Sequence, residues 1–273
     1  MMLRKTSIFM TVAILGTSAV SAGSVLDFLS SSCKNTLQTL LSSPSAGCLN
    51  LGTLTLNALA GNKTIPEVAN SWLTGLCASG SCTNSSLSDV VSNITTGCSE
   101  DLNKYGASSA GFTPDVIQGL VLQYYPTVRQ IACLKDDNAN ELCVPESLFA
   151  LQSIVGTINK GDLDLPTLLG KVKTLADSDY KNIACTGCIK QAYIIAAKVF
   201  PNANLLNLAQ TPITDTCGAS FVDGQDVPGI SETAQSGEFV ATKPNSSGAL
   251  SFKGTGMTGP VFAGLSAALA FLL

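Results

Sequence analysis

Apolar side chains recur every three or four residues along most of the chain. Over residues 24–43 the recurring positions are Val25, Leu29, Cys33, Leu37 and Leu40. Over residues 84–106 they are Leu87, Val90, Val91, Ile94, Cys98, Leu102 and Tyr105. At about 100° per residue each set falls on one side of an α-helix. Similar stripes in residues 144–158, 165–177 and 189–200 extend the helical pattern over the second half.

Prolines and small polar residues mark the ends of the predicted helices. Thr113 can cap a helix whose first residue is Pro114, and Ser85 or Ser86 can cap the helix over 84–106. Pro126 should end or kink the helix that Pro114 begins, because proline lacks the backbone N–H of an internal position. Three further prolines stand at expected helix starts, namely Pro66, Pro145 and Pro166.

These patterns predict an all-α domain over residues 23–222. No stretch alternates apolar and polar residues as a half-buried strand would, so we expect no substantial sheet. Residues 223–247 are polar and lack a helical period, which predicts a flexible stalk.

Both ends of the chain carry the pattern of a targeting signal. Residues 1–22 combine Arg4 and Lys5, a short apolar run and small residues before Gly23, which predicts a cleaved signal peptide. Residues 261–273 are apolar and uncharged, too few to span a bilayer, which takes about 20 residues. A polar spacer precedes them. This pattern predicts that residues 248–273 are the propeptide of a glycosylphosphatidylinositol (GPI) anchor rather than a tail anchor. The attachment residue would be Ser247, Ser246 or Asn245.

The ten cysteines predict five disulfides and stand in two groups of five. They are Cys33, Cys48, Cys77, Cys82, Cys98, Cys133, Cys143, Cys185, Cys188 and Cys217. The spacing suggests a diverged duplication of a five-cysteine helical unit, with halves over 24–112 and 113–222. An odd number in each half requires at least one disulfide between the halves, and the sequence leaves the remaining connectivity open.

Composition narrows the chemistry that the chain can perform. Histidine is absent, which excludes a Ser-His-Asp triad, a Cys-His dyad and any histidine-ligated metal. The net charge of −4 becomes −7 once both signals are removed, because Arg4, Lys5 and Lys253 lie within them. An acidic surface disfavours nucleic acid as a partner. We therefore expect a protein that is not an enzyme and that holds no cofactor and no metal.

Three stretches resemble a family of fungal secreted cysteine-rich proteins, frequent in basidiomycetes and catalogued as a domain of unknown function. They are "CKNTLQTLLSSPSAGCLN", "IPEVANSWLTGLCASGSCTNSSLSDVVSNITTGCSEDL" and "QYYPTVRQIACLKDDNANELCV". Members of that family look like signal-bearing proteins, often with a GPI anchor. The resemblance implies a fungal cell-surface setting and assigns no catalytic residue.

Cys185 and Cys188 form a Cys-x-x-Cys pair at the start of a predicted helix, the layout of a thiol–disulfide redox site. With Cys77 and Cys82 they could also supply four thiolates to zinc. In an oxidising compartment structural disulfides are the expected state. We predict that the pair is structural, bridged either to each other or to distant cysteines.

Two acidic stretches resemble functional sites. Asp136, Asn138 and Asn140 alternate like the start of a calcium loop, but Glu141 replaces the required glycine and Ser147 replaces the bidentate glutamate. A solvated loop, closed by Cys133 and Cys143, is the expected structure. The pairs in "GDLDLP" and "ADSDY" (Asp162, Asp164, Asp177 and Asp179) could serve a glycosidase but are better explained as helix caps.

The remaining candidate sites concern modification and ligand binding. Four asparagines stand in glycosylation sequons: Asn62, Asn84, Asn93 and Asn245. The leading hypothesis is a GPI-anchored fungal surface glycoprotein with a structural or interaction role toward cell-wall glycans or other surface proteins. The alternatives are a binding protein for a lipid or sterol, held between the helices, and a glycan-acting cell-wall enzyme.

Overall fold

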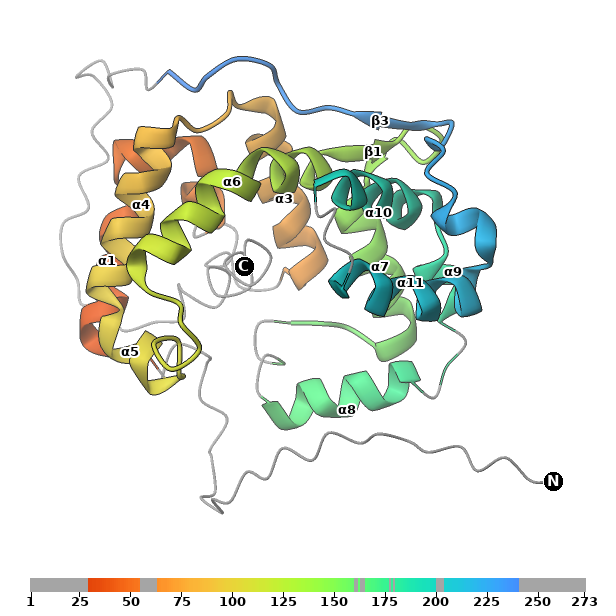
Figure 1. Cartoon of the computed structure of the whole chain (residues 1–273), viewed down its shortest axis with the longest axis horizontal. Helices are drawn as coiled ribbons and strands as arrows, with labels where there is room; N and C mark the ends of the chain where they lie inside the picture. Colours follow the sequence, from red (N-terminus) through yellow and green to blue (C-terminus); the bar gives the residue numbers. More distant parts are fainter. Residues whose placement is uncertain are drawn as a thin grey trace.

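The computed structural model of the chain describes residues 29–54, 63–159, 162, 165–176, 178, 180–199 and 204–240. Helices dominate, which confirms the all-α prediction. In chain order the elements are α1 (Ser31–Leu41), η2 (Pro44–Leu49), α3 (Ile65–Ala78), α4 (Asn84–Gly97), α5 (Ser99–Lys104), α6 (Pro114–Ala132), β1 (Leu134–Asp136), β2 (Glu141–Leu142), α7 (Cys143–Val155), α8 (Leu165–Ala176), α9 (Lys181–Ala184), α10 (Gly187–Val199), α11 (Asn204–Cys217), η4 (Ala219–Val222) and β3 (Ile230–Glu232) (Figure 1). The predicted signal peptide, the anchor signal, Asn62 and Asn245 lie outside the described residues.

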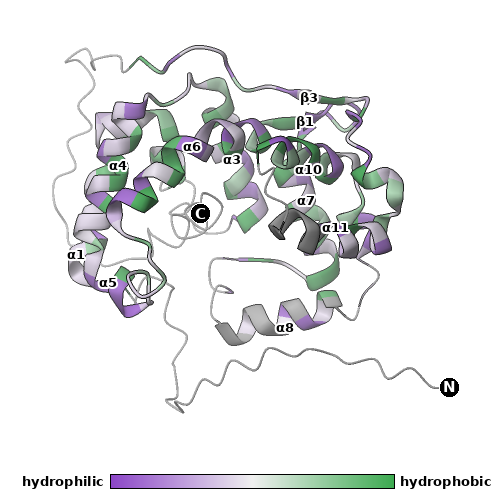
Figure 2. Ribbon diagram, in the orientation of Figure 1, coloured by the Kyte–Doolittle hydropathy of each residue, from purple (hydrophilic) through white to green (hydrophobic). Residues whose placement is uncertain are grey.

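The first core lies among α1, η2, α3 and α4, with α6 packed over α4. Leu37, Leu40 and Leu73 are each only 2% exposed there. Trp72 is buried as well, and its indole N–H donates to the carbonyl of Leu49 (2.8 Å). Figure 2 shows the matching stripes of hydrophobic and hydrophilic residues along α4 and α6. The helical spacing in the sequence is thus the direct cause of this packing.

A smaller core lies beneath the sheet, between α7 and α10. It contains Leu134, Ile195 and the buried disulfide of Cys143 with Cys188. The two cores are continuous parts of one body, because α3 packs on α7 and α6 packs on α10. Within the described part of the chain, each helix is too short or too polar to cross a bilayer.

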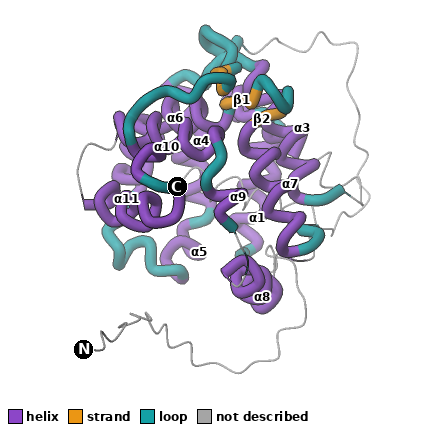
Figure 3. Tube along the Cα trace, turned by 90° about the vertical axis from the view of Figure 1, so that its right-hand side faces the viewer, coloured by secondary structure: helices purple, strands orange, loops and turns teal. Residues whose placement is uncertain are grey.

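The sheet is small and antiparallel, with the strand order β2-β1-β3. Lys135 of β1 pairs with Leu142 on one side and with Ser231 of β3 on the other. Figure 3 shows these strands confined to one end of a helical body. Strands of two or three residues are too short to show alternation, so the sequence pattern could not indicate them.

All ten cysteines are paired, and the prediction of five disulfides is confirmed. The bridges are Cys33–Cys98, Cys48–Cys82, Cys77–Cys133, Cys143–Cys188 and Cys185–Cys217. Cys77–Cys133 supplies the expected bridge between the halves. Only the pairing of the second cysteine with the fourth recurs in both halves, so the disulfide pattern as a whole does not repeat.

The predicted helix ends are partly confirmed. Pro114 does open α6, with Thr113 as its cap. The cap of α4 is Thr83, whose hydroxyl accepts from Ser86 N (3.1 Å), and not Ser85 or Ser86. Pro126 does not end its helix, because α6 continues through it to Ala132. The side chains of Tyr125 before Pro126 and Arg129 after it tie the helix to its neighbours, as described below.

The predicted flexible stalk is wrong for residues 223–240, which lie against the folded body. We call this segment the C-terminal strap. In Figure 1 it runs as the blue trace from beside α10 across to a point above α4. It begins with an ion pair between Asp223 and Lys190 (2.9 Å), and Val227 N donates to Gln191 Oε1 (2.8 Å). The polar composition did not indicate that this segment contacts the body, because backbone hydrogen bonds make most of the contacts between the strap and the body.

The strap caps the C-terminal ends of two helices. Thr233 N donates to the carbonyl of Cys133 (3.0 Å), the C-cap residue of α6. Gln235 N donates to the carbonyl of Cys77 (2.8 Å), in the last turn of α3. The last carbonyls of a helix lack intrahelical donors, so the strap satisfies groups that would otherwise be unpaired. These two cysteines are the ones that the bridge between the halves joins.

The far end of the strap fits against a glycine. Ser81 N donates to Gly237 O (2.8 Å), and Phe239 N donates to Ser81 O (2.9 Å). A Cβ atom at Gly80 would lie 2.6 Å from the backbone carbon of Glu238, closer than real contacts allow. Gly80 therefore permits the close backbone approach, and the Phe239 ring then packs against the first core.

Replacement of Gly80 tests this arrangement. In Gly80→Ala the added methyl should displace the strap, so the amides of Ser81 and Phe239 should lose protection in hydrogen exchange. Gly119→Ala is the matched control, since a Cβ there meets nothing within 4 Å. That variant should keep strap protection and gain about 0.5–1 kcal/mol of stability from helix propensity. Unchanged protection in Gly80→Ala would contradict the close approach.

Candidate functional site

A groove lies beneath the strap, between the start of α4 and the second half of α6. Its volume is about 710 Å³, within the range of about 300–1,000 Å³ typical of ligand sites. The residues that line it come from three segments: Ser81, Cys82, Thr83, Asn84 and Ser85; Leu122, Tyr125, Pro126, Arg129 and Gln130; and Glu232, Ala234 and Glu238. Most of these residues are polar, but apolar atoms, including those of Leu122 and Pro126, make up about half of the exposed wall.

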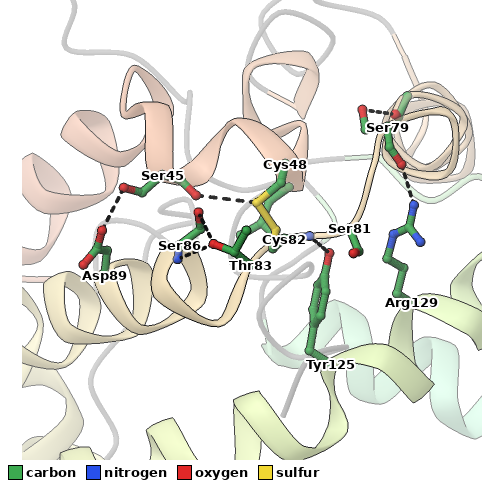
Figure 4. Close-up of a disulfide and its surroundings, with 12 residues drawn as sticks. Ser45, Cys48, Ser79, Ser81, Cys82, Thr83, Ser86, Asp89, Tyr125 and Arg129 are labelled. Carbon is green, nitrogen blue, oxygen red and sulfur yellow. Dashed lines mark hydrogen bonds between the residues drawn. A yellow bond between two sulfur atoms is a disulfide. The ribbon is translucent and has the colours of Figure 1, made fainter. Parts of the chain in front are cut away.

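Tyr125 connects α6 to the start of α4. Its hydroxyl oxygen accepts a hydrogen bond from Cys82 N (3.0 Å), and the side chain is 5% exposed (Figure 4). Burial raises the pKa of the Tyr125 hydroxyl, partly offset by this hydrogen bond and by the charge of Arg129. The hydroxyl therefore stays protonated at neutral pH and retains a proton to donate.

Arg129 lies one helical turn after Tyr125 and is 7% exposed. Its guanidinium donates to the carbonyl of Ser79 at the end of α3 (Figure 4). It also donates to the carbonyl of Gln235 on the strap. Among the described residues no carboxylate pairs with it, and its Nε has no hydrogen-bond partner. The negative end of the α3 dipole favours a cation at this position, which offsets part of the cost of burying the charge.

The rim of the groove carries carboxylate and amide groups. Glu232 accepts a hydrogen bond from Gln130 Nε2 (2.9 Å), and Glu238 is exposed. Asn84 stands at the first position of α4 and is exposed as well. The groove thus offers hydrogen-bond donors and acceptors beside apolar surface, a combination that suits a ligand with both polar and apolar groups.

This arrangement does not favour glycoside hydrolysis. The groove holds two carboxylates, but both Glu232 and Glu238 are exposed. A catalytic acid of that class needs an apolar environment that keeps it protonated while its partner stays ionised. Of the acidic pairs considered from the sequence, Asp162 alone is described. Its carboxylate accepts from the backbone N–H of Asn159 (2.8 Å), three residues earlier in the chain.

The Cys-x-x-Cys pair is not a redox site, because its members are not bonded to each other. Cys185 pairs with Cys217, and Cys188 pairs with Cys143. The zinc alternative fails for the same reason: Cys77 and Cys82 also belong to separate disulfides. A disulfide sulfur lacks the thiolate that would attack a substrate or bind a metal.

The acidic stretch after Cys133 forms the turn between β1 and β2 instead of a calcium loop. Asp136 Oδ1 accepts from the backbone N–H of Asn138 (2.7 Å) and of Ala139 (3.1 Å). Its carboxylate thus serves the turn itself. The expected closure of this loop by Cys133 and Cys143 is wrong, because each cysteine pairs with a distant one. Hydrogen bonds between the strands close the loop in place of a disulfide.

Glu146 lies beside the disulfide of the second core. Its Oε2 is 3.4 Å from Cys188 Sγ, which carries no proton. Burial raises the pKa of the Glu146 carboxyl, and the nearby carboxylates of Asp136 and Glu141 raise it further. The folded state therefore disfavours the ionised form of this side chain.

Both described sequons lie on the surface of α4. Asn84 and Asn93 are exposed, as glycosylation requires, and Asn93 Nδ2 donates to Asp89 O (2.7 Å).

The sequence did not indicate the roles of Tyr125 and Arg129, because a helical stripe does not tell which polar side chains are buried.

A search of known protein families, curated proteins and solved structures finds no match for this chain. The resemblance to fungal secreted proteins stays a prediction.

Removal of the Tyr125 hydroxyl should destabilise the fold. In Tyr125→Phe the buried N–H of Cys82 loses its acceptor, at a cost of about 1–3 kcal/mol in the free energy of unfolding. Urea unfolding with disulfides intact measures this cost. Tyr105→Phe, at a side chain 64% exposed, should change stability by less than about 0.5 kcal/mol. Equal midpoints for the two variants would show that the hydrogen bond contributes nothing.

Glu146 should make stability fall as pH rises. Its pKa is higher in the folded chain than in the unfolded chain, so between the two values the folded state binds more protons. The free energy of unfolding therefore decreases from about pH 4.5 upward through the raised pKa. Glu146→Gln should be more stable than the parent chain at pH 7 and equal to it near pH 3. Glu100→Gln, at an exposed residue of α5, should bring no gain; a gain equal to that of Glu146→Gln would refute the burial effect.

Proposed function

We propose that the chain is a GPI-anchored extracellular glycoprotein of a fungal cell surface, without enzymatic activity. In this proposal a rigid helical body interacts with cell-wall glycans or with other surface proteins. The pairing of all ten cysteines is the observation that carries the proposal. Such complete pairing indicates an oxidising compartment, as found outside the cell and along the secretory route.

The strap supports a short connection between body and anchor. The last described residue, Val240, is seven residues before Ser247 and five before Asn245. Seven extended residues reach at most about 25 Å, whereas a free stalk over 223–247 would reach more than about 80 Å. The body would therefore stay close to the membrane, and its orientation would be restricted by where the strap leaves it.

The groove favours a polar partner over the lipid or sterol of the alternative hypothesis. Nine of its thirteen lining residues carry charged, amide or hydroxyl side chains. Such groups can hydrogen-bond to saccharide hydroxyls, whereas an apolar ligand would leave the groups without hydrogen-bond partners. Exposed sequons at Asn84 and Asn93 agree with passage through the secretory route.

Phospholipase treatment tests the anchor. Phosphatidylinositol-specific phospholipase C should release the protein from intact cells into the medium, since the lipid would be its link to the membrane. Deletion of 261–273 should cause secretion without enzyme, because the attachment signal is then incomplete. If the protein stays in the detergent phase after the enzyme and after wall-glucan digestion, the GPI proposal is wrong.

A further inference from the structure

Asn84 is both a glycosylation sequon and part of the groove wall. It is the first residue of α4 and lines the same groove as Gln130 of α6 and Glu238 of the strap. We propose that the N-linked glycan on Asn84 lies in this groove and covers the junction of α4, α6 and the strap. The inference rests on the proposed secretory route, since glycosylation occurs there.

The two sequons on α4 provide an internal comparison. Asn84 and Asn93 are nine residues apart, which at about 100° per residue places them on opposite sides of the helix. Asn93 therefore points away from the groove, and its amide is bonded to Asp89 O. Within the described part of the chain, the Asn84 amide makes no hydrogen bond. Its Nδ2 is free to carry a sugar that continues into the groove.

The chemistry of the groove matches the inner sugars of a glycan. Sugar rings present hydroxyl and acetamido groups at their edges and C–H groups on their faces. Gln130, Glu232 and Glu238 offer amide and carboxylate partners, while Leu122 and Pro126 offer apolar surface. The volume of about 710 Å³ is ample for a disaccharide unit. Because the glycan is tethered at the rim, its effective concentration is high, and weak contacts suffice to hold it.

A glycan in this position would restrain the strap. The strap residues that line the groove are the ones next to the bonds at Thr233, Gln235 and Phe239. Sugars that contact both α4 and the strap would disfavour local opening of those bonds. Glycosylation at Asn84 would then stabilise the fold, whereas a glycan at Asn93 would extend into solvent and leave the stability of the fold unchanged.

The test compares the full chain, extracted in detergent from a glycosylating host, with Asn84→Gln and Asn93→Gln. Mass spectrometry should find a glycan on Asn84. Asn84→Gln should then lower the Tm by about 2–4 °C and speed strap amide exchange about fivefold. Asn93→Gln should change neither quantity. Endoglycosidase trimming of the folded parent chain should reproduce the Asn84→Gln effect, which separates it from any folding defect.

Three results would overturn the inference. An unmodified Asn84 with a modified Asn93 would do so while leaving the proposed secretory function intact. Equal effects of the two substitutions would show that the groove has no special role. Binding of added diacetylchitobiose to a native chain with unmodified Asn84 would assign the groove to an external saccharide instead. The phospholipase experiment decides the anchor independently of all three.

Discussion

The disulfide between Cys77 and Cys133 is the interaction on which the rest of the structure depends. It joins the C-terminal ends of α3 and α6, which belong to different halves of the cysteine pattern. The carbonyls of the same two residues accept the backbone hydrogen bonds of the strap at Gln235 and Thr233. One covalent bond thus fixes two helix ends at the spacing that a single extended segment can cap.

The candidate site follows from this junction. Because α6 is held beside the end of α3, Arg129 can reach the carbonyl of Ser79, the C-cap residue of α3, and also that of Gln235 on the strap. Tyr125, one turn earlier, then accepts from Cys82 N just before α4 and lines the groove. The groove is therefore a product of helix-end packing, and its polar lining includes groups that also hold the helix ends together, such as Thr83, Tyr125 and Arg129.

Much of the fold was predictable because burial of an apolar helix face leaves a periodic pattern in the sequence. The stripes at Leu37, Leu40 and Leu87 mark buried faces, and Pro114 opens a helix as expected. The strap was not predictable, because it is held by backbone hydrogen bonds that any polar sequence can make. In the candidate site Asn84 was recognisable as a sequon. Arg129 was not, since a buried arginine and a surface arginine look alike in a helical pattern.

The sequence by itself determined the helical class, the oxidised state of the cysteines and the need for a bridge between the halves, because periodicity, an even count and odd halves are local or arithmetical properties. The tertiary structure decided which cysteines meet, and it separated Cys185 from Cys188 into different disulfides. It also turned a polar tail into a cap over two helix ends. Those outcomes depend on distances between segments far apart in the chain, which only packing of the helices sets.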